Sequence, residues 1–161
     1  MEGHNLAEYK EIVGVLNYLE LNFFQIYEDI PTSLCHGDFH ILNIIWGENK
    51  INAVIDWEFC SQTVELYDAA LMVGCLGMEN PEALERGIVK GFIAYLLDTG
   101  IYANISWQNF FELIVGIRLL WLSQWLKYGD KDMIDLEIIY LKLLLDNENY
   151  FKELWGIDKF N

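Results

Sequence analysis

The apolar positions of the chain follow a helical period over most of its length. From residue 6 to residue 30 they recur every three or four residues, which is typical of a helix that buries one face, and Pro31 would end that helix. The positions are Leu6, Tyr9, Val13, Leu16, Leu19, Phe23, Ile26 and Ile30. Similar patterns predict four more helices, over residues 64–77, 80–97, 106–128 and 130–150. In the last helix we expect these residues to face inward: Met133, Leu136, Tyr140, Leu143 and Leu144.

One segment departs from the helical pattern. The runs NIIW and INAVIDW are β-branched or aromatic and are separated by GENK, which predicts a β-hairpin, the one β element that we expect. A turn centred between Asn49 and Lys50 would set Asn43 opposite Asp56 with Cα atoms ~5 Å apart, and a slip of one or two residues is the alternative register. Since no repeat or linker is visible, we expect one domain over 1–161, mainly α with a small β-hairpin (α+β).

Composition excludes some classes of partner. The chain has 25 acidic and 10 basic residues and a net charge of -15, so a nucleic acid would be repelled. The longest apolar stretch is interrupted by Arg118 and falls short of a membrane span, so we expect no membrane partner. The three cysteines have no CxxC spacing and are odd in number, which favours reduced thiols in a cytoplasmic protein.

Polar residues gather around the predicted hairpin. Asn43 and Asp56 would bring an amide oxygen and a carboxylate to its open end, and such a pair suits Mg²⁺ with water and substrate phosphates. Asp38 lies on the loop before the first strand, where it could act as a general base on a hydroxyl that attacks phosphorus.

These residues also carry a family resemblance. HGDFHILN followed by VIDWE resembles the aminoglycoside phosphotransferase and choline kinase-like family, relatives of the protein kinases, whose catalytic loop reads H-R-D-x-x-x-x-N. The resemblance implies that Asp38 is the catalytic base and that Asn43 and Asp56 bind the Mg²⁺ ions that bridge the phosphates of ATP. His40 matches the family's H-G-D-x-H-x-x-N form, whereas Ile and Leu occupy positions 41 and 42, where Pro and Gly are common.

Other residues receive supporting roles from the resemblance. His36 would brace the catalytic loop, and Asp68, in LYDAALMV, would open a helix and buttress the same loop. Trp57 and Glu58 would line the acceptor site, although Trp57 is as well explained as a core residue.

The implied fold is the C-terminal lobe of a protein kinase-like enzyme. Its catalytic loop and metal hairpin would occupy 34–58, and its helical acceptor-binding region would occupy 64–155. Only 35 residues precede His36, and the chain contains no GxGxxG and no lysine-bearing V-A-I-K strand, so we expect an N-terminal ATP-binding lobe to be missing and the chain alone to be incomplete and inactive. The expected reaction moves the γ-phosphoryl of ATP to a hydroxyl of a small molecule, such as an aminoglycoside or an amino alcohol.

Several alternatives stay open at this point. The chain could be a truncated, non-catalytic helical module that binds a partner or forms a homo-oligomer through exposed apolar surface. His36, Asp38 and His40 could instead bind zinc, or the HGD segment could be a structural turn. Aromatic residues near three acids would suit an aminated acceptor through cation-π contacts, although helical spacing makes most of these tryptophans core residues. The residues concerned are Trp107, Trp121, Trp125 and Trp155, with Asp130, Asp132 and Asp135.

Overall fold

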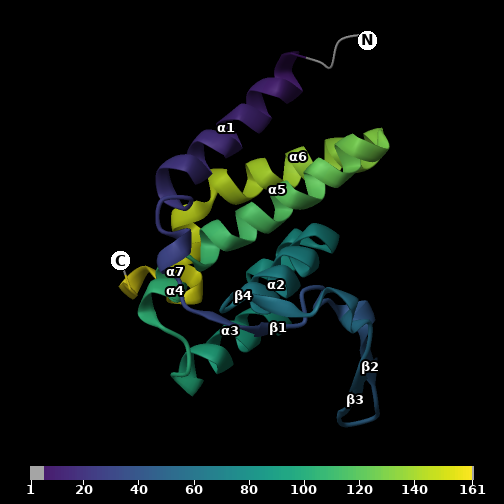
Figure 1. The fold of residues 1–161 in the computed structure, drawn as a ribbon, viewed down its shortest axis with the longest axis vertical. Helices are drawn as coiled ribbons and strands as arrows, with labels where there is room; N and C mark the ends of the chain where they lie inside the picture. Colours follow the sequence, from purple (N-terminus) through teal and green to yellow (C-terminus); the bar gives the residue numbers. More distant parts are fainter. Residues whose placement is uncertain (1–5, 161) are drawn as a thin grey trace.

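Helices dominate the architecture, with two small antiparallel sheets (Figure 1). The computed structural model describes the backbone of residues 6–160 and the side chains of residues 10–160. The helices are α1 (Leu6–Asn22), α2 (Tyr67–Glu79), α3 (Ile88–Thr99), α4 (Asn104–Gln108), α5 (Phe110–Tyr128), α6 (Lys131–Asp146) and α7 (Glu148–Trp155). The strands are β1 (Thr32–Cys35), β2 (Ile44–Trp46), β3 (Ile51–Val54) and β4 (Ser61–Val64). β1 and β4 lie beside α2, and β2 and β3 project at the lower right of Figure 1. The prediction of a mainly helical α+β chain is confirmed.

Helix α5 is central to the core. It packs against α2 on one side and against α1 and α6 on the other, as Figure 1 shows. Phe110, Phe111, Ile114 and Leu122 of α5 are completely buried, because apolar residues occupy more than one face of this helix. Burial of such side chains is the main favourable term in folding, so α5 fixes the positions of the elements around it.

Several predicted helices are shorter or divided. The predicted helix 6–30 ends at Asn22, and a turn with the short 3-10 helix Tyr27–Asp29 replaces its last part. The predicted helix 80–97 begins as a 3-10 turn and starts again at Ile88, because Gly87 has a positive φ of 66°. The predicted helix 106–128 is divided between α4 and α5, and 130–150 between α6 and α7.

The prediction of which residues of α6 face inward is partly wrong. Tyr140 and Leu144 are buried as predicted, but Leu136 is 45% exposed. Ile134 and Glu137 face inward instead, because a buried arginine draws Glu137 into the core.

That arginine and Glu137 form a completely enclosed ion pair. Arg118 Nε donates to Glu137 Oε1 at 2.7 Å, and Nη2 donates to Oε2 at 2.5 Å, so the pair is bidentate. A second largely buried cation, the ammonium of Lys152, donates to Glu112 at 2.5 Å and to Glu148 at 2.6 Å. Burial alone would lower the pKa of Lys152, but the Glu112 carboxylate beside it raises that pKa above its ordinary value.

The hairpin of β2 and β3 forms as predicted, but its register was wrong by one residue. The turn is closed by Gly47 N–H donating to Lys50 C=O at 2.7 Å, which centres it one residue earlier than expected. An irregularity between Ile45 and Trp46 then leaves Ile44 paired with Val54. Ile55, whose N–H donates to the Asn43 carbonyl at 3.0 Å, therefore takes the place predicted for Asp56.

A second strand pair was missed. β1 and β4 pair antiparallel, with Thr32 opposite Val64 and Cys35 opposite Ser61. Each strand has only four residues and no apolar alternation that would reveal it. The pair closes the base of the segment between residues 35 and 61, so the predicted site is held at both ends.

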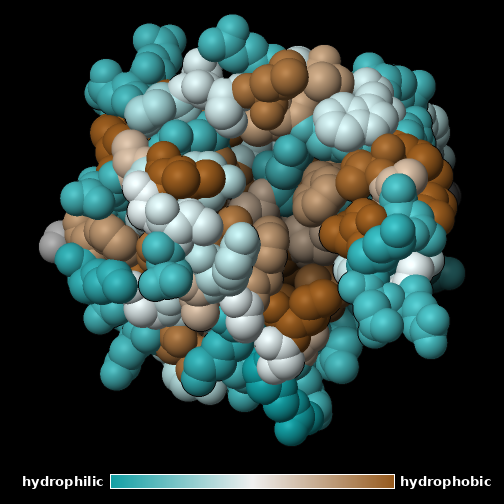
Figure 2. Space-filling model, turned by 90° about the horizontal axis from the view of Figure 1, so that it is seen from below, coloured by the Kyte–Doolittle hydropathy of each residue, from teal (hydrophilic) through white to brown (hydrophobic). Residues whose placement is uncertain are grey.

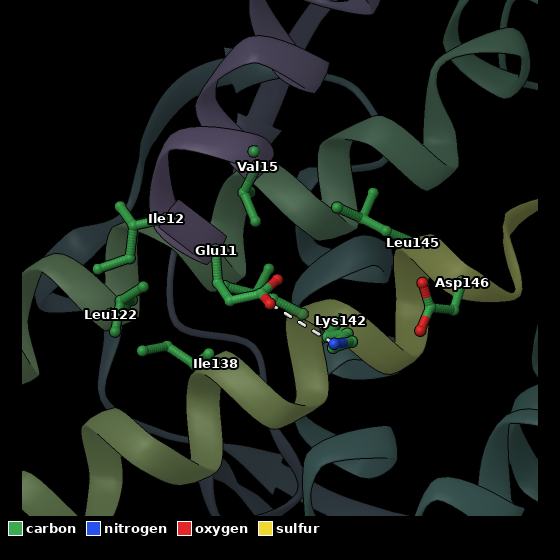
Figure 3. A pocket seen from close by; sticks show the side chains of 10 residues that line it. Glu11, Ile12, Val15, Leu122, Ile138, Lys142, Leu145 and Asp146 are labelled. Carbon is green, nitrogen blue, oxygen red and sulfur yellow. Dashed lines mark hydrogen bonds and ion pairs between the residues drawn. The ribbon is translucent and has the colours of Figure 1, made fainter. Parts of the chain in front are cut away.

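The interface of α1 with α5 and α6 contains a small cavity of about 100 Å³ (Figure 3). Ile12, Val15, Leu122 and Ile138 contribute apolar side chains to it, and Lys142 Nζ lies 3.5 Å from a Glu11 oxygen at its edge. None of the sequence-predicted site residues lines this cavity, so we regard it as a packing defect between helices. Within residues 6–160, no helix has the length and apolar character needed to cross a membrane.

Candidate active site

His36 connects the predicted catalytic loop to the hairpin. Its ring is 3% exposed, and its Nε2 lies 2.9 Å from the Ile55 carbonyl, one residue before Asp56. Its Nδ1 accepts the backbone N–H of Asp38 at 3.3 Å. Through these two contacts His36 ties the loop of Asp38 to the strand that leads to Asp56.

Asp68 clamps the start of the same loop. Its Oδ2 accepts the backbone N–H of His36 at 2.7 Å, and its Oδ1 accepts that of Gly37 at 2.9 Å. Asp68 lies in the first turn of α2, where a carboxylate is also favoured by the helix dipole. Leu66, the residue before α2, has φ 67°, a conformation that costs a non-glycine residue about 1–3 kcal/mol. The structure thus accepts backbone strain where the chain turns toward Asp68.

Gly37 makes the close approach of this loop to the next turn possible. Its φ is +84°, and a Cβ atom built on it would lie 2.4 Å from the Phe59 carbonyl oxygen. The 3-10 turn Trp57–Phe59 therefore packs directly on the loop, and the Trp57 ring lies 4.6 Å from the His36 ring, between centroids. Only glycine satisfies both the conformation and the space at this position.

Asp38 is held by two neighbours on one oxygen. Asn43 Nδ2 donates to Asp38 Oδ2 at 3.1 Å and to the Asp38 carbonyl at 2.8 Å, and His40 Nε2 lies 3.4 Å from the same Oδ2. His40 Nδ1 accepts the Leu42 N–H at 3.3 Å, which orients the His40 ring. Among the residues that the structure describes, Oδ1 of Asp38 has no hydrogen-bond partner, so this oxygen can accept a proton from a bound hydroxyl.

Asp56 follows β3 in a left-handed conformation, with φ 67° and ψ 58°. Over residues 6–160, Asp56 and Leu66 are the two non-glycine residues with positive φ; Asp56 is a predicted site residue, and Leu66 lies two residues before another, Asp68. Such strain clusters at functional sites because a specific orientation of a side chain is needed there. The Asp56 side chain is exposed and makes no hydrogen bond or ion pair within the described chain.

The donor chemistry at this end of the hairpin fits Mg²⁺. The amide nitrogen of Asn43 is engaged with Asp38, which leaves its oxygen as an acceptor, and Asp56 offers an uncommitted carboxylate. Mg²⁺ prefers such hard oxygen ligands, needs few from the protein and keeps water and phosphate in its other positions. In the part of the chain with described side chains, no three His, Cys, Asp or Glu residues converge as a metal cluster, which leaves the zinc alternative without support.

A cleft of about 480 Å³ opens beside Asp38, and we call it the Asp38 cleft. Its walls come from the loop of Gly37 and Asp38, the Trp57–Phe59 turn, α2 and mainly the C-terminal half of α5. The residues are Gly37, Asp38, Phe59, Tyr67, Leu71, Ile117, Leu120, Trp121, Gln124, Trp125 and Tyr128. The rings of Trp121 and Trp125 stack with centroids 5.8 Å apart. Burial raises the pKa of the Tyr67 phenol, which therefore stays protonated near neutral pH.

The four tryptophans named as candidate acceptor residues are divided between the core and the Asp38 cleft. Trp107 and Trp155 are buried core residues, whereas Trp121 and Trp125 line the Asp38 cleft. Trp57 and Glu58 do not line this cleft, and the Trp57 indole N–H donates to the Val54 carbonyl at 2.8 Å. Their role in acceptor binding stays a prediction.

Sequence reasoning missed Phe59, Tyr67 and Tyr128 as residues of the cleft. Two features of the sequence could have indicated the cleft. The apolar positions of α5 are too many for one buried face. The glycine between His36 and Asp38 marks a special backbone conformation. Nothing in the sequence indicated which side of α5 would face Asp38, because that depends on the packing of α2.

Comparison with protein-family models indicates the family of the chain. The model described as the phosphotransferase enzyme family matches residues 4–102, a range that contains the loop, the hairpin and α2. Comparisons with curated proteins and with solved structures gave no significant match.

Proposed function

This chain belongs to the phosphotransferase enzyme family, and from that premise we propose that it transfers the γ-phosphoryl group of ATP to a hydroxyl of a small molecule. The observation that carries the proposal is the arrangement around Asp38. One oxygen of its carboxylate is fixed by Asn43 and His40, and the other is available beside a cleft large enough for a small molecule.

The geometry supports the following roles for the residues in the proposed reaction. Asp38 orients the acceptor hydroxyl and takes its proton as the oxygen attacks phosphorus. Asn43 and Asp56 would hold Mg²⁺, which when bound supplies charge neutralisation for the phosphates of ATP. His36 and Asp68 keep the loop in place through the Ile55 carbonyl and the backbone N–H groups of the loop, so they act as positioning residues.

We also propose that the chain is the catalytic, C-terminal lobe of a kinase-like fold and that a nucleotide-binding lobe covers its hairpin side. Large apolar side chains are exposed on β1, on the short turn before the hairpin and on β2, namely Leu34 at 76%, Leu42 at 75% and Trp46 at 52%. Figure 2 views the molecule from below, where hydrophobic surface flanks a hollow on the side on which Figure 1 places β2 and β3. Exposed apolar surface of this kind favours a covering partner.

Identification of the product tests the proposed reaction. With Mg²⁺, ATP and a panel of hydroxyl compounds, the complete product of the gene should form ADP and a phosphomonoester, which phosphorus-31 NMR resolves. Chelation of the metal should stop the reaction. Release of inorganic phosphate alone, with no ester from any acceptor that binds, would contradict phosphoryl transfer to a hydroxyl.

A metal titration tests the ligand assignment on the 161-residue chain itself. Mn²⁺ in place of Mg²⁺ should broaden the amide NMR signals of Asn43 and Asp56, and Asp56→Asn should weaken this effect. Asp135→Asn, a change at an exposed position of α6, is the matched control and should leave the broadening unchanged. Equal broadening in both variants would remove Asp56 from the metal site.

The exposed apolar side chains also support a second function, that of a non-catalytic module that self-associates. Leu34, Leu42 and Trp46 could be covered by a second copy instead of a nucleotide-binding lobe. Sedimentation velocity discriminates, because a concentration-independent monomer would rule out self-association.

A further inference from the structure

A second apolar cleft continues from the Asp38 cleft along α5. It has a volume of about 310 Å³ and shares Tyr67, Ile117 and Leu120 with the Asp38 cleft, and we call it the α1 cleft because Phe23 and Phe24, just beyond α1, form its other wall. The shared residues make the two clefts neighbours, so one elongated molecule can occupy both. Leu120, 59% exposed, lies on the rim between them.

The lining of the two clefts has little charge. Among the described residues that line them, Asp38 is the only one with a charged side chain, and Gln124 is the only amide. The acidic residues Asp130 and Asp132, which lie close to Tyr128 in sequence, are exposed and outside both linings. A polycationic acceptor would have to leave water without carboxylates to replace its hydration, whereas an apolar body would gain from burial against aromatic and aliphatic side chains.

We propose that the acceptor is an alcohol with a long, predominantly apolar body. Its hydroxyl points to Oδ1 of Asp38, the part next to the hydroxyl lies in the Asp38 cleft, and the rest extends past Leu120 into the α1 cleft. The transfer of phosphate to this alcohol rests on the proposed function. In that step the alcohol oxygen forms a bond to the γ-phosphorus, the bond from that phosphorus to the ADP oxygen breaks, ADP leaves with the electron pair, and Asp38 takes the hydroxyl proton.

The test is a series of linear primary alcohols, titrated calorimetrically into the 161-residue chain without ATP or metal. Affinity should rise from hexan-1-ol through octan-1-ol to decan-1-ol, by about threefold to fourfold for each methylene that becomes buried. Choline and kanamycin, as probes of the aminated acceptors expected from the sequence, should bind at least about tenfold more weakly than decan-1-ol, since burial of several methylenes alone exceeds that factor.

A blocking variant locates the far end of the ligand. Gly116 lies in the wall of the α1 cleft, and a Cβ atom there would be 3.6 Å from the Phe23 ring, an ordinary contact, so Gly116→Phe should fill the cleft with its ring. In this variant the affinity for linear alcohols should stop rising at a shorter alcohol than it does in the unsubstituted chain. Gly91→Phe is the matched control, because Gly91 is exposed on helix α3 and its Cβ position has open space around it. In this variant affinity should rise over the full alcohol series.

A second pair of variants covers the case in which Gly116→Phe does not fold. Leu120→Glu places a carboxylate between the two clefts and should weaken decan-1-ol by more than about tenfold, the equivalent of two or more buried methylenes. Leu136→Glu, at a 45% exposed position of α6 outside both clefts, should not weaken it.

The outcomes separate this inference from the proposed function. Tighter binding of choline or kanamycin than of decan-1-ol would overturn the inference, as would a chain-length series that Gly116→Phe and Leu120→Glu leave unchanged. Because binding is measured without ATP, an absence of phosphoryl transfer despite these alcohol affinities would refute the function and leave the cleft assignment standing. Transfer only to aminated acceptors would support the proposed function and overturn the cleft assignment.

Discussion

Removal of the negative charge of Asp68 is expected to loosen the candidate catalytic loop. In Asp68→Asn one oxygen can still accept an N–H, but the amide nitrogen faces the other N–H, so one charge-assisted bond to His36 or Gly37 is lost. Such a bond contributes about 1.5–3 kcal/mol, and the interaction of the charge with the α2 dipole adds about 0.3–1 kcal/mol. The free energy of unfolding should therefore fall by about 2–4 kcal/mol.

A urea titration followed by tryptophan fluorescence measures this change, with linear extrapolation to water. Asp132→Asn is the control, because Asp132 lies in the first turn of α6, is exposed, and tests the loss of the dipole interaction without the loop contacts. Asp132→Asn should lower the free energy of unfolding by no more than about 1 kcal/mol. A loss in Asp68→Asn equal to that in Asp132→Asn would refute the argument that Asp68 holds the loop.

Three further changes test other parts of the structure. Gly37→Ala should destabilise the fold by about 1–3 kcal/mol in the same titration, because of its positive φ and the contact with Phe59, whereas Gly14→Ala, in α1 with open space around it, should stabilise by about 0.5–1 kcal/mol. Arg118→Met should lower the free energy of unfolding by about 3–5 kcal/mol, because it leaves the Glu137 carboxylate buried and uncompensated. The double variant Arg118→Met, Glu137→Leu should recover much of that stability, and no recovery would contradict the account. Burial raises the pKa of the Cys35 and Cys75 thiols and so lowers their thiolate fraction at pH 8, so a disulfide reagent should label exposed Cys60 first and the other two only on unfolding.

The elements of the fold were largely predictable from sequence, because periodicity and turn chemistry are local signals, whereas the roles of the site residues stay predictions. The helical segments around Leu19, Phe110 and Tyr140 follow from apolar period, and the hairpin follows from two β-branched runs around a turn. The register of the hairpin was not predictable to one residue, because the turn closes at Gly47 and the irregularity after Ile45 cannot be read from composition.

The rest of the site depends on contacts between distant segments. The pairing of β1 with β4 joins residues about thirty apart through strands too short to have a pattern. The approach of Trp121 and Trp125 to Asp38 depends on how α5 packs against α2, and no pattern in the sequence marks the positive φ of Leu66. The candidate site residues could therefore be named from the sequence, whereas the tertiary structure determines which residues line the cleft beside Asp38.

The central claim is that Asp38 is the base of a phosphoryl-transfer site, and the turnover number of Asp38→Asn in the complete gene product tests it most directly. The substitution preserves size and removes the ability to accept the hydroxyl proton, so kcat for the best acceptor should fall by about 10²–10⁴. Its unfolding midpoint should stay close to that of the unsubstituted protein, and Asp132→Asn should retain full turnover. A folded Asp38→Asn protein that turns over at the unsubstituted rate would contradict the account.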